Sequence, residues 1–443
     1  MAEAAAAHSA PLERGARNVN TRGDHDVHPG EIAIGVVIGR TSEFFDFFVY
    51  ALASVIVFPA LVFPYLDRFT GTVMSFAIFA LAFVARPIGT RIFMEVDRRH
   101  GRGTKLTAAL FLLGTSTVAM AFLPSYGEVG MASVVLLAIA RTLQGLAWGG
   151  AWDGLASLLA LNAPPNRRGW WAMVPQLGAP LGLLLASGLF AFFLGTLASN
   201  DFIAWGWRYP FFVAFAINVV ALFARLRIVV TPEYTKLFET RELTPSRVTA
   251  TLHAQWRNIV IGAFAPLASF ALFHMVTVFP LSWVALFTRE SVTGFLMIEM
   301  VGAVVGVFAI IASGLLADRV GRRSLLGYTA AAIAVFSGFA PLLLNGGQTG
   351  ETIFMIVGFV LLGLSFGQSS GAVASNFPKG ARYTGAAITS DLAWLFGAGF
   401  APLAALLLAQ HFGLIAAGAY LLSGSIATLV ALRFNKELAR RLD

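Results

Sequence analysis

Residues 314–323 read Gly-Leu-Leu-Ala-Asp-Arg-Val-Gly-Arg-Arg, a short basic turn between two long apolar segments. A similar turn, Asp97-Arg-Arg-His-Gly-Arg102, occurs earlier, and its Gly101 lies 220 positions before Gly321 in a chain of 443 residues. Ala179-Pro-Leu is likewise repeated as Ala401-Pro-Leu, 222 positions later. The chain therefore consists of two similar halves in the same order. This pattern is typical of membrane proteins in which one half rocks against the other around a central site.

The composition indicates a membrane protein. Hydrophobic residues make up 57% of the chain, charged residues only 12%, and the mean hydropathy is +0.76. Soluble domains carry about 25% charged residues. The net charge of +8 lies mostly in short loops, so we interpret it as a topology signal and expect no nucleic-acid partner. The chain has no cysteine, which excludes disulfides and cysteine metal sites.

Twelve apolar segments have the length of about 20 residues that a membrane-spanning helix needs. They are predicted at 32–58, 70–94, 105–124, 131–162, 170–196, 207–230, 257–287, 293–317, 324–344, 353–377, 383–409 and 413–433. We therefore expect an all-α integral membrane protein with twelve transmembrane helices in two six-helix bundles related by pseudo-two-fold symmetry. The bundles are predicted at 31–230 and 257–433, joined by a polar cytoplasmic linker at 231–256.

Basic residues predict the orientation, because Lys and Arg collect on cytoplasmic loops. They concentrate on the loops after the even-numbered spans and on the C-terminal tail, whereas the other loops hold only Arg68, Arg208 and Arg289. Both tails, 1–30 and 434–443, are therefore expected in the cytoplasm. The first tail is polar, which argues against a cleaved signal peptide, and we expect it to be disordered. The predicted location is the bacterial cytoplasmic (inner) membrane.

The turn Asp318-Arg-Val-Gly-Arg-Arg323 resembles the loop signature of the major facilitator superfamily. Glu43-Phe-Phe-Asp46-Phe-Phe-Val-Tyr50, Arg86-Pro-Ile-Gly89 and Arg141-Thr-Leu-Gln144-Gly together resemble its metabolite:proton symporter branch. The resemblance implies a monomeric carrier in the lipid bilayer that moves organic acids, amino acids or betaines together with protons by alternating access.

Two acids near the middle of the first span need an explanation. A charge at a helix centre costs about 2.5–3.5 kcal/mol on insertion scales. Glu43 and Asp46 share one helix face with Arg40 and Tyr50. One reading is an internal Arg40–Glu43 ion pair that lets the helix insert. The other is a carboxyl facing a cavity that exchanges its proton, for which Asp46 is the better candidate because Arg40 is nearer Glu43.

Arg141 in the fourth span is the third predicted proton-coupling residue, beside Asp46 and Glu43. A guanidinium keeps its charge, so Arg141 requires a carboxylate or an anionic solute, and Glu43 and Asp46 are its expected partners. A fixed structural salt bridge is the alternative. In the resembled superfamily, the Arg at this place is commonly tied to coupling. The predicted substrate-binding residues are Arg40, Tyr50, Gln144, Trp148 and Asp391.

Asp391 departs from the resembled branch, which usually has a neutral polar residue there, and Arg382 is its expected counter-charge. Asp391 is expected either to bind the substrate or a proton, or to form a purely structural ion pair. Glu299 is expected either to be interfacial or to be functional. His274 is expected either to titrate or to be a hydrogen-bonded packing residue.

The branch often has an acid directly after the two glycines of the fourth span, but here Ala151 follows Gly150 and Asp153 comes two residues later. Ser375 stands where the branch often has an acid, just before Phe377-Pro378.

The two basic turns are candidate gates. Asp318 is expected to accept hydrogen bonds at the N-terminus of a neighbouring span, where the helix dipole favours an anion. Its neighbours Arg319, Arg322 and Arg323 are expected to bridge to acids or lipid phosphates; a merely solvated loop is the alternative. The earlier turn, with Asp97, Arg98 and Arg102, has one extra residue and Met94 in place of a Gly, which leaves open whether it acts as a latch.

These patterns favour a proton-coupled secondary transporter of a small polar metabolite. The alternatives are proton-driven efflux of an amphipathic compound and a membrane solute sensor that transports nothing. We find no metal cluster, no nucleophile–base arrangement and no Gly-x-x-x-x-Gly-Lys-[Ser/Thr] phosphate loop. No enzymatic activity, cofactor, metal or intrinsic ATP site is therefore expected.

Overall fold

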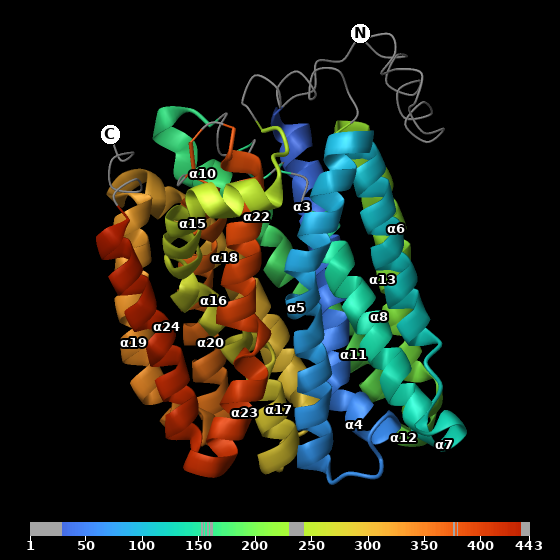
Figure 1. Cartoon of the computed structure of the whole chain (residues 1–443). Helices are drawn as coiled ribbons and strands as arrows, with labels where there is room; N and C mark the ends of the chain where they lie inside the picture. Colours follow the sequence, from blue (N-terminus) through green and yellow to red (C-terminus); the bar gives the residue numbers. More distant parts are fainter. Residues whose placement is uncertain are drawn as a thin grey trace.

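The computed structural model describes residues 29–151, 163–229, 243–374 and 380–435, together with positions 154, 156, 159, 377 and 378. The described part consists of helices and connecting turns without a strand. Figure 1 shows the helices standing side by side in two groups. We call the side on which α3 begins and α24 ends the terminal face (top of Figure 1), and the other side the opposite face.

Six spanning helices form the N-terminal bundle. They are α3 (Pro29–Ile56), α5 (Arg68–His100), α6 (Arg102–Ala121), α8 (Met131–Gly150), α11 (Gly178–Thr196) and α13 (Tyr209–Val229). The span of α11 starts earlier with η1 (Pro165–Arg167), α10 (Arg168–Met173) and η2 (Val174–Leu177), and that of α13 with η3 (Gly206–Arg208). Short helices at the opposite face are α4 (Phe58–Leu61), α7 (Tyr126–Val129) and α12 (Ser199–Ala204).

The C-terminal bundle repeats this order with more interruptions. Its first span is divided into α15 (Val248–Phe264), α16 (Leu267–Thr277) and α17 (Phe279–Phe287). The next spans are α18 (Val292–Val320), α19 (Arg322–Leu344), and α20 (Gly347–Phe366) with α21 (Ser369–Ala374). The last two are α22 (Arg382–Ala393) with the π-helical turn η4 (Trp394–Gly399) and α23 (Ala401–Phe412), and α24 (Leu414–Phe434).

The predicted fold class is confirmed. Among the described residues, eleven helical segments are long and apolar enough to cross a membrane. The twelfth span, α3, is 28 residues long but carries Arg40, Glu43 and Asp46, whose charges are satisfied inside the protein. Most of the predicted tail 1–30 and the first part of the predicted linker, 231–242, lie outside the described residues.

Two predicted boundaries differ from the structure. The fourth span was predicted to reach residue 162, but α8 ends at Gly150, and Gly154 has a positive φ of 76° that is incompatible with a continuing helix. The predicted linker also contains the start of α15, which begins at Val248 and bends at Gln255 (φ −123°, ψ 18°). Hydropathy does not mark either break, because the residues on both sides remain apolar or helix-compatible.

The two basic turns have the same backbone conformation in both halves. Gly101 between α5 and α6 has φ 86° and ψ 165°, and Gly321 between α18 and α19 has φ 84° and ψ 144°. This region of φ/ψ space is essentially restricted to glycine. The internal repeat seen in the sequence is therefore a structural repeat of helix–turn–helix units.

Small residues allow α5 and α8 to touch through their backbones. A Cβ at Gly145 would collide with the carbonyl oxygen of Ala82, and one at Gly149 with the carbonyl oxygen of Arg86. Glycines four residues apart on one helix face permit such a close approach of backbones. It fixes the face of α8 that carries Arg141 against α5.

Replacement of Gly145 by Ala should therefore destabilise the protein. Alanine gains up to about 1 kcal/mol of helix propensity over glycine, but overpacking against backbone typically costs about 1–3 kcal/mol. Thermal unfolding in detergent measures the difference. The matched control is Gly338→Ala, since a Cβ at this exposed site in α19 meets nothing within 4 Å. Equal stability of the two variants would contradict the close-packing argument.

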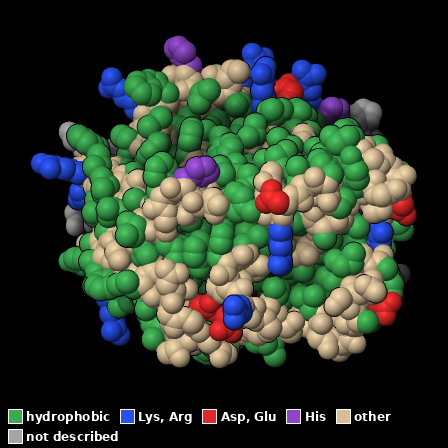
Figure 2. Space-filling view, turned by 90° about the horizontal axis from the view of Figure 1, so that it is seen from below, with side chains coloured by type: hydrophobic (Ala, Val, Ile, Leu, Met, Phe, Trp, Pro, Cys, Tyr) green, Lys and Arg blue, Asp and Glu red, His purple; other side chains and the backbone are tan. Residues whose placement is uncertain are grey.

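The opposite face is closed. Its centre is filled by hydrophobic and neutral side chains, with scattered charged ones (Figure 2). Phe69 of α5 and Phe287 of α17 meet there across the two bundles, with ring centroids 6.2 Å apart. Deeper in the interface, α11 packs along α18.

Candidate transport site

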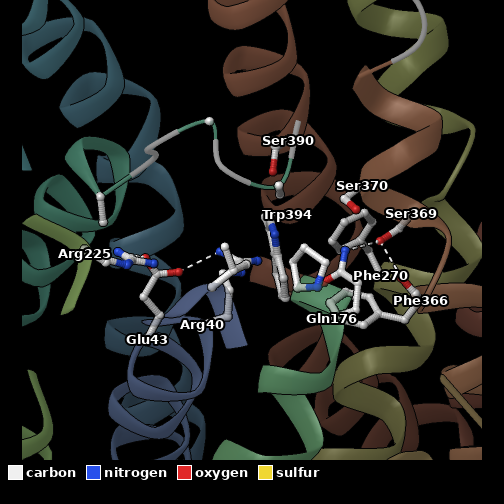
Figure 3. A pocket seen from close by; sticks show the side chains of 15 residues that line it. Arg40, Glu43, Gln176, Arg225, Phe270, Phe366, Ser369, Ser370, Ser390 and Trp394 are labelled. Carbon is white, nitrogen blue, oxygen red and sulfur yellow. Dashed lines mark hydrogen bonds and ion pairs between the residues drawn. The ribbon is translucent and has the colours of Figure 1, made fainter. Parts of the chain in front are cut away.

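Two small cavities lie between the bundles and share Arg40, Glu43 and Trp394. Each has a volume of about 40 Å³, enough for a few water molecules. Figure 3 shows Gln176, Ser369 and other polar side chains on the far side of the first cavity. The second is enclosed by aromatic rings and Arg86, its aromatic lining being Phe44, Phe47, Phe83, Trp148 and Trp394. The two cavities are therefore parts of one central site, which in this structure is narrowed to a size that holds only a few water molecules.

Glu43 is held between two arginines. Its Oε2 is 2.6 Å from Nη1 of Arg40, and its Oε1 is 2.6 Å from Nη1 of Arg225 on α13. The Arg225 guanidinium passes over Gly39, where a Cβ would collide with it. The Arg40–Glu43 pair was anticipated from spacing, whereas Arg225 was missed. The only signal for it was an arginine inside the sixth predicted span.

Asp46 lies away from the cavities, among helices of the N-terminal bundle, and is fully buried. Its Oδ1 accepts hydrogen bonds from the hydroxyl of Thr117 and from Nδ2 of Asn218 at 3.3 Å. Its Oδ2 accepts one from Nε2 of Gln144 at 2.7 Å. Ser42 donates to Oδ1 of Asn218, which turns the amide group of that side chain toward Asp46. The carboxyl thus joins α3, α6, α8 and α13.

Within the described part of the chain, Arg141 is not bonded directly to an acid, contrary to the sequence-based expectation. Its Nη1 donates to Oε1 of Gln144, whose amide group then donates to Asp46, and its Nε donates to the Phe79 carbonyl at 3.2 Å. Its guanidinium lies 3.9 Å from the ring centroid of Tyr50 and 4.8 Å from that of Trp148. The Gln144 amide, one turn along α8, separates the two charges, and aromatic faces cover the cation.

The counter-charge of Asp391 is Arg86 rather than the expected Arg382. Nε of Arg86 lies 2.8 Å from Oδ1 of Asp391, and the Thr90 hydroxyl donates to Oδ2 at 2.5 Å. The pair joins α5 of one bundle to α22 of the other. Arg382 precedes Asp391 by nine residues, which is about 13 Å along a helix and too far for contact. The partner came from a different half of the chain.

His274 and Glu299 are both fully buried in the described structure. The ring of His274 stacks on Phe47 at a centroid distance of 5.2 Å, and neither ring nitrogen has a hydrogen-bond partner among the described residues. Packing is thus its observed role, without the expected hydrogen bond. The interfacial reading of Glu299 is wrong, because its carboxyl lies inside the contact between α11 and α18.

The Asp318 turn makes the contact predicted for it. Asp318 accepts hydrogen bonds from the backbone N–H groups of Gly169 at 2.6 Å and Trp170 at 3.1 Å, at the start of α10. Arg322 donates to the Arg168 carbonyl at 3.3 Å, also across the two halves. These contacts join the two halves at the terminal face. Arg323 instead binds the Leu432 carbonyl within its own bundle, and Arg319 is exposed.

The earlier basic turn also reaches the other half, but through a side chain. Asp97 is paired with Lys105 at 3.0 Å and accepts a hydrogen bond from the Tyr383 hydroxyl, in the first turn of α22, at 3.2 Å. Arg102 donates to the Leu243 carbonyl at 2.7 Å. Arg98 stays local, paired with Glu95 at 2.6 Å. Both turns therefore contact the other bundle in this structure.

Replacement of Asp318 by Ala should open the terminal face. It removes two hydrogen bonds to a charged group, each worth about 1.5–3 kcal/mol. Because the chain has no cysteine, a single Ser390→Cys in the cavity lining can report access without background. We expect the rate of maleimide labelling at this cysteine to be at least about tenfold higher with Asp318→Ala than without it. Arg319→Gln, at an exposed position of the same turn, is the control, and equal labelling rates would contradict the latch.

Comparison with known proteins agrees with this architecture. A family model described as Major Facilitator Superfamily matches residues 44–402. The chain belongs to the major facilitator superfamily, among its metabolite transporters, and is not an enzyme. It is 38% identical over 416 residues to the inner membrane metabolite transport protein YhjE of Escherichia coli (strain K12), covering 92% of this chain and 94% of that protein.

Two further matches extend the comparison. A citrate-proton symporter of Klebsiella pneumoniae is 27% identical over 405 residues, covering 89% of each chain. A crystal structure of D-xylose-proton symporter superposes with a TM-score of 0.69 at 19% identity, covering 92% of this chain and 97% of that one. The latter likeness concerns the fold. The protein is thus a multi-pass membrane transporter.

Proposed function

We propose that the protein is a symporter that carries a small organic anion together with a proton, with both termini in the cytoplasm. The observation that carries this proposal is the charge around the central cavities. Among the described residues, the guanidinium groups of Arg40, Arg86 and Arg225 gather around these cavities, where they pair with Glu43 and Asp391. Such a cluster of guanidinium groups suits an anionic substrate.

The cavity lining suits a carboxylate attached to a compact, partly apolar body. Arginine binds carboxylates through parallel hydrogen bonds, and Nε of Arg40 is buried without a partner among the described residues. Gln176, Ser369 and Ser370 offer further polar contacts, and the rings of Trp148 and Trp394 supply flat apolar walls. Such a combination of few polar anchors and aromatic walls is typical of small-molecule sites.

Asp46 is the proposed coupling carboxyl. In the present state it accepts three hydrogen bonds and balances Arg141 through Gln144. Protonation of Asp46 would remove that charge and weaken its hydrogen bond with Gln144. Gln144 could then release Arg141, whose guanidinium packs on Trp148, a wall of the second cavity. A carrier loaded with an anion and a proton would then reorient without added charge. The name of the citrate-proton relative supports coupling of this kind.

Alternating access would use the contacts described at the two faces. The Asp318 and Asp97 bridges hold the terminal face shut, and the α11–α18 contact holds the opposite face shut. The proposal that the terminal face is cytoplasmic rests on the basic residues of its loops. Binding of substrate between Arg40 and Arg86 would compete with Glu43 and Asp391 and loosen the bundles.

Uptake into proteoliposomes with an imposed pH gradient, alkaline inside, tests the function. The panel contains an aromatic monocarboxylate, a hydroxylated cyclic acid, a tricarboxylate, a betaine and a neutral sugar. We expect gradient-dependent accumulation of a carboxylate and none of the sugar. Accumulation of the betaine alone would overturn the anion assignment, outward pumping would indicate efflux, and failure of every solute to cross would favour a sensor.

A further inference from the structure

Glu299 is a buried carboxyl that the proposed mechanism leaves unused. It lies in the second turn of α18, on the opposite-face side of the central cavities, and its exposed fraction is 0%. Its Oε2 accepts a hydrogen bond from the hydroxyl of Ser187, on α11 of the other bundle, at 2.9 Å. Its Oε1 has no hydrogen-bond partner among the described residues. The carboxyl is therefore sealed inside the contact between the two halves.

Among the described residues, Glu299 has no ion-pair partner and a single hydrogen-bond donor. α11 and α17, which pack against α18 here, have no charged residue at all. The charged residues of α18 itself, Asp318 and Arg319, lie at its far end. The other charged groups toward the opposite face are Glu351 at the start of α20, and the exposed Arg289 and Glu290 just before α18; none of them is bonded to Glu299 among the described residues. A lone carboxylate in such an interface costs several kcal/mol unless it is protonated or hydrated.

Glu299 is also separated from the proposed coupling site. Asp46 accepts hydrogen bonds from side chains of three helices, and one of these donors, Gln144, also binds Arg141. Glu299, by contrast, accepts one hydrogen bond, from the Ser187 hydroxyl, among the described residues. Between Glu299 and the central cavities lies an apolar pocket that includes Phe48, Phe273 and Phe359. A proton on Glu299 would exchange with the opposite face when α11 and α18 part, since water then reaches the carboxyl from that side.

The geometry points to Glu299 and Ser187 as a second proton-binding site, which takes up one proton as α11 closes on α18 and releases it as the opposite face opens. With the proton present, the carboxyl is neutral and Ser187 remains hydrogen-bonded across the interface. With the proton absent, the closed interface would hold an unpaired charge, so the halves separate there. The site goes beyond the symport proposed above and does not depend on the substrate.

Distance measurement on spin-labelled protein tests this site without substrate. Labels are placed on Thr196→Cys and Thr293→Cys, at the opposite-face ends of α11 and α18, in a chain with no other cysteine. In lipid nanodiscs, we expect the closed, short-distance population to fall as pH rises. The ratio of closed to open should change by up to about tenfold per pH unit where the group titrates, which is the limit for a single proton.

Glu299→Gln is the decisive variant, because it keeps the shape and the hydrogen bond from Ser187 but has no group that ionises in this pH range. We expect it to stay closed, with a ratio that varies by less than about twofold over the same pH range. Gel filtration and thermal unfolding confirm that it folds. Retention of the wild-type pH response in Glu299→Gln, or a pH-independent wild type, overturns the inference.

Two controls separate this site from other acids. Asp46→Asn should keep the pH response at the opposite face, because Asp46 belongs to the other network; its loss there would assign the response to Asp46 and overturn the inference. Glu351→Gln tests the nearest acid on α20 in the same way. Since no transported solute is involved, failure of the symport proposal and failure of this one give different results.

Discussion

Replacing Asp46 by Asn is expected to abolish pH-gradient-driven accumulation of substrate while leaving exchange of substrate across the membrane in place. Asn has nearly the same shape but cannot gain or lose a proton in this range. The carrier would be fixed in a state that resembles protonated Asp46, with Arg141 no longer balanced through Gln144. Substrate could still enter the cavity between Arg40 and Arg86, so exchange of labelled for unlabelled substrate should continue.

The measurement compares accumulation with counterflow in proteoliposomes containing equal amounts of folded protein. The folding control matters because Asn places an amide NH2 where Asp46 has an accepting oxygen, so at least one of the three donors loses its partner. A lost hydrogen bond to a buried group costs about 1–3 kcal/mol. Asp201→Asn, at an exposed position in α12, is the matched substitution and should accumulate substrate normally. If Asp46→Asn accumulated substrate as the wild type does, Asp46 would have no part in coupling.

Breaking the Arg86–Asp391 pair should have the largest effect on stability. The side chain of Asp391 is 3% exposed, so Arg86→Gln leaves a buried carboxylate whose remaining donor among the described residues is Thr90. Removing one member of a buried ion pair typically costs about 3–5 kcal/mol. We expect a lower unfolding temperature in detergent and low yield. Adding Asp391→Asn removes the orphaned charge, and the double variant should recover most of the lost stability.

The same pair distinguishes a structural role from a binding role. If Arg86 also holds the substrate anion, as proposed, the stable double variant will still fail to accumulate it. Recovery of both stability and uptake in the double variant would show that the pair serves only to join α5 to α22. The Arg98–Glu95 pair, which is more exposed and lies within one helix, offers a matched comparison: Arg98→Gln should change the stability little.

The number and order of the spans could be predicted from the sequence because hydropathy and the cost of exposing backbone in lipid act locally. The Asp318 contact was also predictable, since a helix N-terminus attracts an anion wherever the two meet. Likewise, the presence of Glu43, Asp46, Arg141 and Asp391 in apolar spans showed that partners must exist. Their cost in lipid is set by the residue type and by depth in the membrane.

The choice of partners was decided only by the tertiary structure. Arg86 is 305 positions from Asp391, and Glu43 forms an ion pair with Arg225 from the last helix of the same bundle. Gln144 stands between Arg141 and Asp46, and Glu299 lies in an interface instead of at the membrane surface. Helix periodicity tells which residues share a face, but pairing depends on which faces of different helices adjoin. That arrangement follows from close packing of small residues such as Gly145 and Gly149, over distances that no local pattern encodes.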